Sequence, residues 1–174
     1  FAGNLNLTSL NIDKETAEAT VTFNGGSAQT VVGNLTTTAD GDGTVVINNS
    51  SGVTFNDDFG VAGNGVGSLQ ITSGSTMNLA AIAVGTDNLT FDVVGNIDSN
   101  GTGGTGGTLV ITGGNSTGSG NTGDAITLAT VTGTTKLTTL TIKGGNASEN
   151  DVGGAVTQTD FNGNTTVTTY NVLG

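Results

Sequence analysis

Thr108-Leu-Val-Ile-Thr-Gly-Gly-Asn115 is nearly repeated further on as Thr139-Leu-Thr-Ile-Lys-Gly-Gly-Asn146. In both segments apolar and polar side chains largely alternate, and two glycines follow. A period of two places successive side chains on opposite faces of a β-strand. Glycine tolerates the backbone angles of the tight turn that ends a strand. The pair therefore predicts two strands of a repeating β-fold.

Similar short blocks recur along the whole chain, separated by segments rich in Gly, Asn, Ser and Asp. Thr and Val favour strands because branched side chains suit the pleated backbone, whereas helix-forming residues are scarce. The 174 residues predict a single β-rich domain, 1–174. We predict strands at Leu5–Ile12, Ala19–Phe23, Thr44–Ile47, Val53–Phe55, Ser68–Ile71, Met77–Val84, Asn88–Val94, Thr108–Ile111, Ala125–Val131, Lys136–Ile142 and Thr165–Val172.

The spacing of the blocks favours a parallel β-helix, or β-solenoid. Leu69-Gln-Ile71, Leu89-Thr-Phe91 and Leu109-Val-Ile111 follow one another at equal intervals along the chain. Irregular coils of about 20 residues are typical of a three-faced β-helix. Such coils would align Asn and Thr in hydrogen-bonded ladders between rungs. The alternative is an antiparallel β-sandwich of the jelly-roll type, which is disfavoured because aromatic residues, usual in sandwich cores, make up only 4% of the chain.

The charge balance limits the partners. The formal net charge is −11, with three lysines and no arginine or histidine. Phosphate backbones would be repelled, so we expect no nucleic-acid binding, and anionic membrane surfaces are disfavoured as well. We expect no membrane span, because no apolar run approaches the roughly 18 residues required. The absence of a starting Met and of a signal peptide predicts a processed chain or an excised fragment.

Several quoted runs resemble repeats in autotransporter passenger domains, rickettsial-type outer surface antigens and bacterial surface-layer proteins. The runs are Ala19-Thr-Val-Thr-Phe-Asn-Gly-Gly26, Val32-Gly-Asn-Leu-Thr-Thr-Thr38, Asp42-Gly-Thr-Val-Val-Ile-Asn-Asn49 and Leu109-Val-Ile-Thr-Gly-Gly114. The likeness is short and compositional, and it extends over most of the chain. It implies a β-rich, often β-helical protein that is secreted and assembled at the cell surface. Because we expect no C-terminal membrane β-barrel in this chain, it would correspond only to a passenger if its parent were an autotransporter.

Carboxylates are the main source of candidate chemistry. Asp40-Gly41-Asp42 and Asp57-Asp58 are tight clusters, and Ca²⁺ binds six to eight oxygen ligands. Asp87 and Asp124 stand in fragments of the Gly-Gly-x-Gly-x-Asp pattern of calcium-binding repeat proteins. These six residues are therefore the calcium candidates. The competing interpretation is that such aspartates serve turns, where their side chains bond the local backbone.

A non-catalytic role follows from what the chain lacks. Without His or Cys there is no ordinary general base or thiol nucleophile. We predict an extracellular structural protein that forms or decorates a cell-surface layer or filament by self-assembly. The alternatives are an adhesin module that binds a host or glycan surface and, less favoured, a β-helical polysaccharide-degrading enzyme. Subunit contacts are expected at Ala2–Ile12 and Thr165–Leu173, because terminal strands present unpaired backbone groups.

Overall fold

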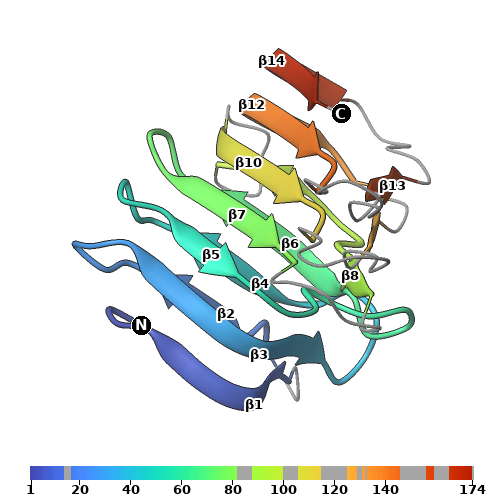
Figure 1. The fold of residues 1–174 in the computed structure, drawn as a ribbon. Helices are drawn as coiled ribbons and strands as arrows, with labels where there is room; N and C mark the ends of the chain where they lie inside the picture. The colour runs from blue at the N-terminus through green and yellow to red at the C-terminus, as the bar shows by residue number, and fades with distance from the viewer. Residues whose placement is uncertain are drawn as a thin grey trace, which may run out of the picture.

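The chain forms a β-solenoid whose strands are stacked in three rows (Figure 1). The structure is a computed structural model, and it describes residues 1–13, 17–81, 88–99, 106–114, 125–128, 131, 133–145, 156–158 and 165–173. Within these residues every regular element is a β-strand and none is a helix. The all-β prediction is thus confirmed.

Each row consists of strands from successive coils. The first row contains β1 (Leu5–Ile12), β3 (Gln29–Thr37), β5 (Val53–Phe55), β7 (Thr76–Ala80), β10 (Gly106–Thr112), β12 (Thr135–Lys143) and β14 (Thr165–Leu173). The second row contains β2 (Thr20–Phe23), β4 (Asp42–Ile47), β6 (Val66–Ile71) and β9 (Ile97–Asp98), and β9 pairs with the beginning of β12. The third row contains β8 (Leu89–Phe91), β11 (Ile126–Leu128) and β13 (Val156–Gln158).

All pairs between the named strands are parallel, so the antiparallel-sandwich alternative is wrong. In Figure 1 the first row rises from β1, beside the N-terminus, to β14, beside the C-terminus. Parallel neighbours require the chain to travel round a full coil before it returns to the same row. The irregular β-solenoid expected from the alternating blocks is confirmed.

The coils are longer than the expected length of about 20 residues. Thr20 pairs with Thr44, and Gln29 pairs with Val53, so one coil advances the chain from position 20 to position 44. Leu69, Leu89 and Leu109, whose spacing suggested the shorter coil, lie in β6, β8 and β10, which belong to three different rows. The repeated segments that begin at Thr108 and Thr139 do lie on adjacent rungs, because Thr108 pairs with Thr139.

Apolar residues form continuous columns through the interior. One column runs through all seven strands of the first row among the described residues, and its members are Leu5, Val31, Phe55, Leu79, Ile111, Ile142 and Val172. Its five middle members are buried, and its two outermost members are not. Each inner rung covers the next, so the side chains of neighbouring coils bury one another.

The five described phenylalanines gather in one stack. The rings of Phe1, Phe23, Phe55, Phe59 and Phe91 follow one another at centroid separations of 5.6, 5.3, 5.0 and 5.6 Å. Such offset and edge-to-face contacts add about 0.5–1.5 kcal/mol per pair beyond area burial. The low aromatic content correctly favoured a solenoid over a sandwich, although the solenoid core also contains an aromatic stack.

Glycines occupy corners where neighbouring coils approach most closely. A Cβ on Gly67 would lie 2.2 Å from the carbonyl oxygen of Gly41, and one on Gly95 would lie 2.0 Å from that of Gly67. Gly133 continues the same column, since its Cβ would lie 2.3 Å from the carbonyl carbon of Gly95. No side chain fits at these distances, so a column of glycines lets the coils close at this corner.

The outer surface carries the predicted polar ladders in part. Asn78 Nδ2 donates to Thr54 Oγ1 at 3.4 Å, and Asn171 Nδ2 donates to Thr141 Oγ1 at 3.3 Å. Both bonds join directly paired strands of the first row, β5 with β7 and β12 with β14. These outer bonds are long, so they fix register more than they stabilise the fold.

Candidate functional site

The N-terminal end of the solenoid presents apolar side chains that no described coil covers. Leu5 and Leu10 of β1 pack against the core but are only half-buried. Phe1 and Leu7 are exposed to 50% and 41%. Equivalent positions one rung further in, such as Val31 and Leu35, are completely buried. The end therefore exposes a cross-section of the core.

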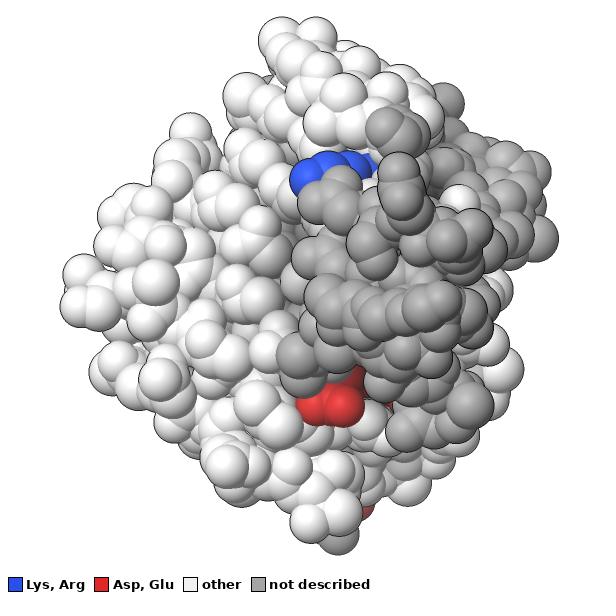
Figure 2. Space-filling model, viewed as in Figure 1, with Lys and Arg blue, Asp and Glu red and all other residues white. Residues whose placement is uncertain are grey.

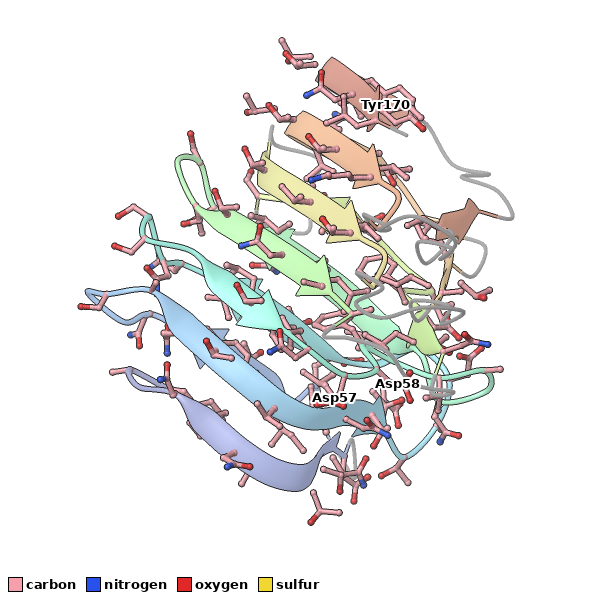
Figure 3. The ribbon with its side chains drawn as sticks, in the orientation of Figure 1. Asp57, Asp58 and Tyr170 are labelled. Carbon is pink, nitrogen blue, oxygen red and sulfur yellow. The ribbon has the colours of Figure 1, made fainter. Side chains whose placement is uncertain are left out.

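The opposite end has the same character. Val167, Tyr170 and Val172 of β14 pair with Leu137, Leu140 and Ile142, which are buried core residues. Tyr170 and Val172 nevertheless remain 54% and 66% exposed. Figure 3 shows Tyr170 on β14, the uppermost strand in this view. These residues hold core positions without a described rung above them.

Both terminal strands also have a free hydrogen-bonding edge within the part of the chain that the structure describes. β1 pairs only with β3, and β14 pairs only with β12. A free edge presents alternating N–H and C=O groups that can pair with another strand. On the face shown in Figure 2, most described atoms belong to uncharged residues, with a small basic patch towards the C-terminal end and acidic atoms lower down.

A buried glutamine organises the N-terminal end. Gln29 Nε2 donates to the carbonyl oxygens of Phe1 and Gly3 at 3.3 and 2.9 Å. Gln29 Oε1 accepts from the backbone N–H of Gly25 at 3.0 Å and from Asn49 Nδ2 at 2.9 Å. The sequence analysis missed this residue, because it lies in β3, a strand that the alternation did not predict. Its bonds hold residues 1–3 against β3.

Two adjacent candidate aspartates connect coils through the backbone. Asp57 Oδ2 accepts from the N–H of Gly33 at 2.7 Å, and Asp58 Oδ1 accepts from the N–H of Thr90 at 2.8 Å. The two are adjacent in the corner that follows β5 (Figure 3), yet they bind coils on opposite sides. Charged acceptors make stronger bonds to N–H groups than neutral ones do.

In the second acidic pair, Asp40 and Asp42, one carboxylate bonds another coil and the other bonds its own turn. Asp40 Oδ1 accepts from the N–H of Gly65, in the next coil, at 3.0 Å. Asp42 Oδ2 accepts from the N–H of Ala39 at 3.0 Å, which is a local turn bond. The local turn bond of the competing interpretation is therefore present at Asp42, whereas Asp40, Asp57 and Asp58 accept from backbone N–H groups of other coils. Asp87 and Asp124 lie outside the described residues.

Asp92 is a buried carboxylate that the sequence analysis did not single out. Burial, and then the neighbouring charge of Asp40, raise its pKa above the ordinary value of 3.8. A Cβ on Gly65 would lie 2.7 Å from Asp92 Oδ1 and 3.0 Å from Asp40 Oδ1, so both carboxylates lie against this glycine. Unlike Asp57 and Asp58, Asp92 has no acidic neighbour in the sequence to draw attention to it.

The described residues contain no group of three or more His, Cys, Asp or Glu side chains placed to hold a metal ion. Calcium binding by the six candidate aspartates consequently stays a prediction, and two of the six are not described.

No protein-family model, curated protein or solved structure matches this chain. The resemblance to bacterial surface proteins therefore remains one of short sequence runs. In the described residues, none of the elements is a helix long and apolar enough to cross a membrane.

Proposed function

We propose that this protein is a non-catalytic extracellular structural protein that forms or decorates a cell-surface layer or filament by binding copies of itself. The observation that carries the proposal is the apolar cross-section exposed at both ends, at Phe1 and Leu7 and at Tyr170 and Val172. Large exposed apolar patches commonly mark association surfaces. Among the described residues each patch lies beside a strand edge that has no partner strand, which adds backbone hydrogen bonding to apolar burial.

The residue inventory supports the non-catalytic part of the proposal. The chain has no His and no Cys, and the described carboxylates Asp40, Asp57 and Asp58 accept bonds from backbone N–H groups. A carboxylate engaged in this way is a structural acceptor rather than a proton donor. The extracellular location rests on composition and on the likeness to surface proteins, and protease treatment of intact source cells would test it.

The first experiment asks whether the protein associates at all. Sedimentation velocity and negative-stain images of the purified chain are expected to show oligomers, lattices or filaments. Because the net charge is −11, copies repel one another at low ionic strength, and association should increase as salt shortens the Debye length to about 8 Å at 0.15 M. A monomer at every salt and protein concentration would contradict the proposal and favour the adhesin alternative.

Deletion of Phe1–Ile12 tests the N-terminal end. The truncated chain should lose the polymers while retaining the β circular-dichroism spectrum of a folded monomer. Its new end would present Gln29, whose Nε2 would lack the acceptors supplied by Phe1 and Gly3. An unsatisfied polar group at a contact costs about 1–3 kcal/mol, which opposes renewed stacking on β3. Polymers that survive the deletion would remove this end from the interface.

Calcium is tested separately by melting curves in EDTA and in added CaCl₂. A structural ion at the aspartate corners would raise the midpoint in CaCl₂, and chelator would reverse the shift. An unchanged midpoint would dismiss calcium and leave backbone bonding as the role of Asp57 and Asp58.

A further inference from the structure

We infer that copies of this chain stack head-to-tail along the solenoid axis, with Val172 of one copy directly beside Leu5 of the next. This inference rests on the proposed function and specifies its geometry: one direction, one register and one pair of unlike ends.

The first argument is the continuity of the apolar column. Leu5 and Val172 are the outermost members of the same column, and five buried residues lie between them: Val31, Phe55, Leu79, Ile111 and Ile142. A second copy translated along the axis would place its Leu5 above Val172 as Val172 lies above Ile142. The interface would then be one more rung, with parallel pairing like the others at a spacing of about 4.8 Å.

The second argument is the fit between the two ends. In this register Tyr170, two residues before Val172, faces Gly3, two residues before Leu5. Tyr170 is the bulkiest side chain on β14, and it is 54% exposed. A Cβ on Gly3 would meet no atom within 4 Å, so the space beside Gly3 is open. A large ring on one end thus faces an unoccupied position on the other.

The third argument excludes like-to-like pairing. A two-fold contact between two C-terminal ends would pair β14 with β14 in antiparallel orientation, unlike every pair between the named strands. It would also confront Tyr170 and Val172 with bulky residues rather than with Gly3. Heterologous contacts of the head-to-tail kind propagate without closing, which produces filaments.

Cysteine cross-linking tests the register, because the chain has no cysteine of its own. Asn6 follows Leu5 and Leu173 follows Val172, and both are exposed. The predicted rung brings their Cα atoms to roughly 4.8 Å, within the roughly 4.4–6.8 Å that a disulfide spans. Oxidation with copper–phenanthroline should therefore link Asn6→Cys to Leu173→Cys in a mixture of the two variants, whereas neither variant alone should form covalent dimers.

The matched control moves one cysteine along the same strand. Asn11 is also exposed on β1, but it lies further along the strand, about 16 Å from Asn6 at roughly 3.3 Å per residue. Asn11→Cys mixed with Leu173→Cys should remain unlinked. Dimers of Asn6→Cys alone, or equal linking through Asn11→Cys, would overturn the head-to-tail register.

A second pair of variants blocks the contact without cysteine. Gly3→Arg places a long charged side chain in the space assigned to Tyr170 and should abolish assembly with an unchanged melting midpoint. Gly26→Arg is the control, since Gly26 is exposed and its Cβ would likewise meet nothing within 4 Å. If the Gly3→Arg variant still assembles, the head-to-tail register is wrong but the proposed self-assembly stands. If the wild-type chain never associates, both the register and the proposed function are wrong.

Discussion

The coils built from residues 20–81 and those built from residues 88–145 share one register but differ in length. In the first region, β5 pairs with β7, and Thr54 is bonded to Asn78 across 24 residues of chain. In the second, β8 pairs with β11, and Asn88 is bonded to Ala125 across 37 residues. The first row nevertheless continues without interruption through β10 and β12.

The difference shows that the stacked columns, and not the coil length, define this fold. Extra residues enter between strands, where lengthening a loop costs only about 0.6 kcal/mol per doubling. A change inside a column affects every rung in contact with it, because the interior is close-packed. Perturbations of columns should therefore have larger effects than perturbations of corners or loops.

The largest effect is expected where the two regions meet. The ring of Phe59 contacts Phe55 in the regular coils and Phe91 in the first long coil. Phe59→Ala should reduce the free energy of unfolding by about 3–5 kcal/mol, since it empties a fully buried site. Chemical denaturation measures the loss. Phe59→Leu, which retains most of the apolar volume, should lose much less, and equal losses would show that the stack is not the cause.

The next effect is expected in the glycine column that passes through both regions. Gly95→Ala would force a methyl group to within 2.0 Å of the carbonyl oxygen of Gly67. Separating the coils should cost about 1–3 kcal/mol, the usual range for overpacking. The control, Gly26→Ala, has open space and should change the melting midpoint little. If Gly95→Ala leaves the free energy of unfolding unchanged, the coils do not need to approach so closely at this corner.

A smaller change, of opposite sign, is expected at Thr135 in the longer coils. Its side chain is buried beside Ile97 in the second row, and its Oγ1 has no hydrogen-bond partner among the described residues. Thr135→Val should stabilise the fold by about 1 kcal/mol by removing the unsatisfied hydroxyl. Thr139→Val, at a half-buried position of the same strand, is the comparison, and a thermal melt that ranks the two variants equally would contradict this account.

The carboxylates of Asp40, in the first region, and Asp92, in the second, both lie against Gly65. Because the pKa of Asp92 is raised in the fold, the native state loses stability as the pH rises from the ordinary value of 3.8 through the raised pKa. Asp92→Asn should therefore raise the melting midpoint at pH 7, and the gain should vanish below pH 3.8, where wild-type Asp92 is protonated in both states. Melting curves of the wild-type chain and Asp92→Asn between pH 3 and 8, spaced about one unit apart, measure this gain. A difference in midpoint that does not change with pH would show that the ionisation of Asp92 is not its cause.

The smallest effect is expected from lengthening a regular coil. Ala62 and Gly63 form an exposed turn between Val61 and Asn64. A Gly-Ser insertion between them that doubles this loop should cost about 0.6 kcal/mol. It would give the regular region a coil closer in length to those of the second region. A loss as large as that of Phe59→Ala in denaturation would show that coil length is specified more tightly than the second region suggests.

The candidate sites were predictable to different degrees. Within the terminal segments Ala2–Ile12 and Thr165–Leu173, Leu5–Ile12 and Thr165–Leu173 are strands, and each pairs with a single strand among the described residues. Asp57 and Asp58 were visible as a pair, but their bonds to Gly33 and Thr90 depend on coils 24 and 32 residues away. Asp92 and Gln29 carry no local signal, since what distinguishes them is burial and partners from other coils.

The sequence by itself determined most of the strands. Alternation is a local property, and Leu5–Ile12 and Val53–Phe55 begin and end where it predicts. It missed β3, β9 and β13. Of these, β3 contains Gly33 with a φ of 109° next to a register shift against β1. A glycine within a strand interrupts the alternation, and here it marks an irregularity that only the neighbouring strand explains.

Only the tertiary structure decided which strands lie on one another. The three similar, equally spaced blocks at Leu69, Leu89 and Leu109 proved to belong to different rows, whereas the echoed segments formed adjacent rungs. In the echo, a Cβ on Gly145 would lie 1.8 Å from the carbonyl oxygen of Gly114, so no side chain fits on Gly145 where the coils meet. Stacking brings together residues that are distant in the chain. The register of the stacked strands depends on how side chains pack between rungs, and a local sequence period contains no information about that packing.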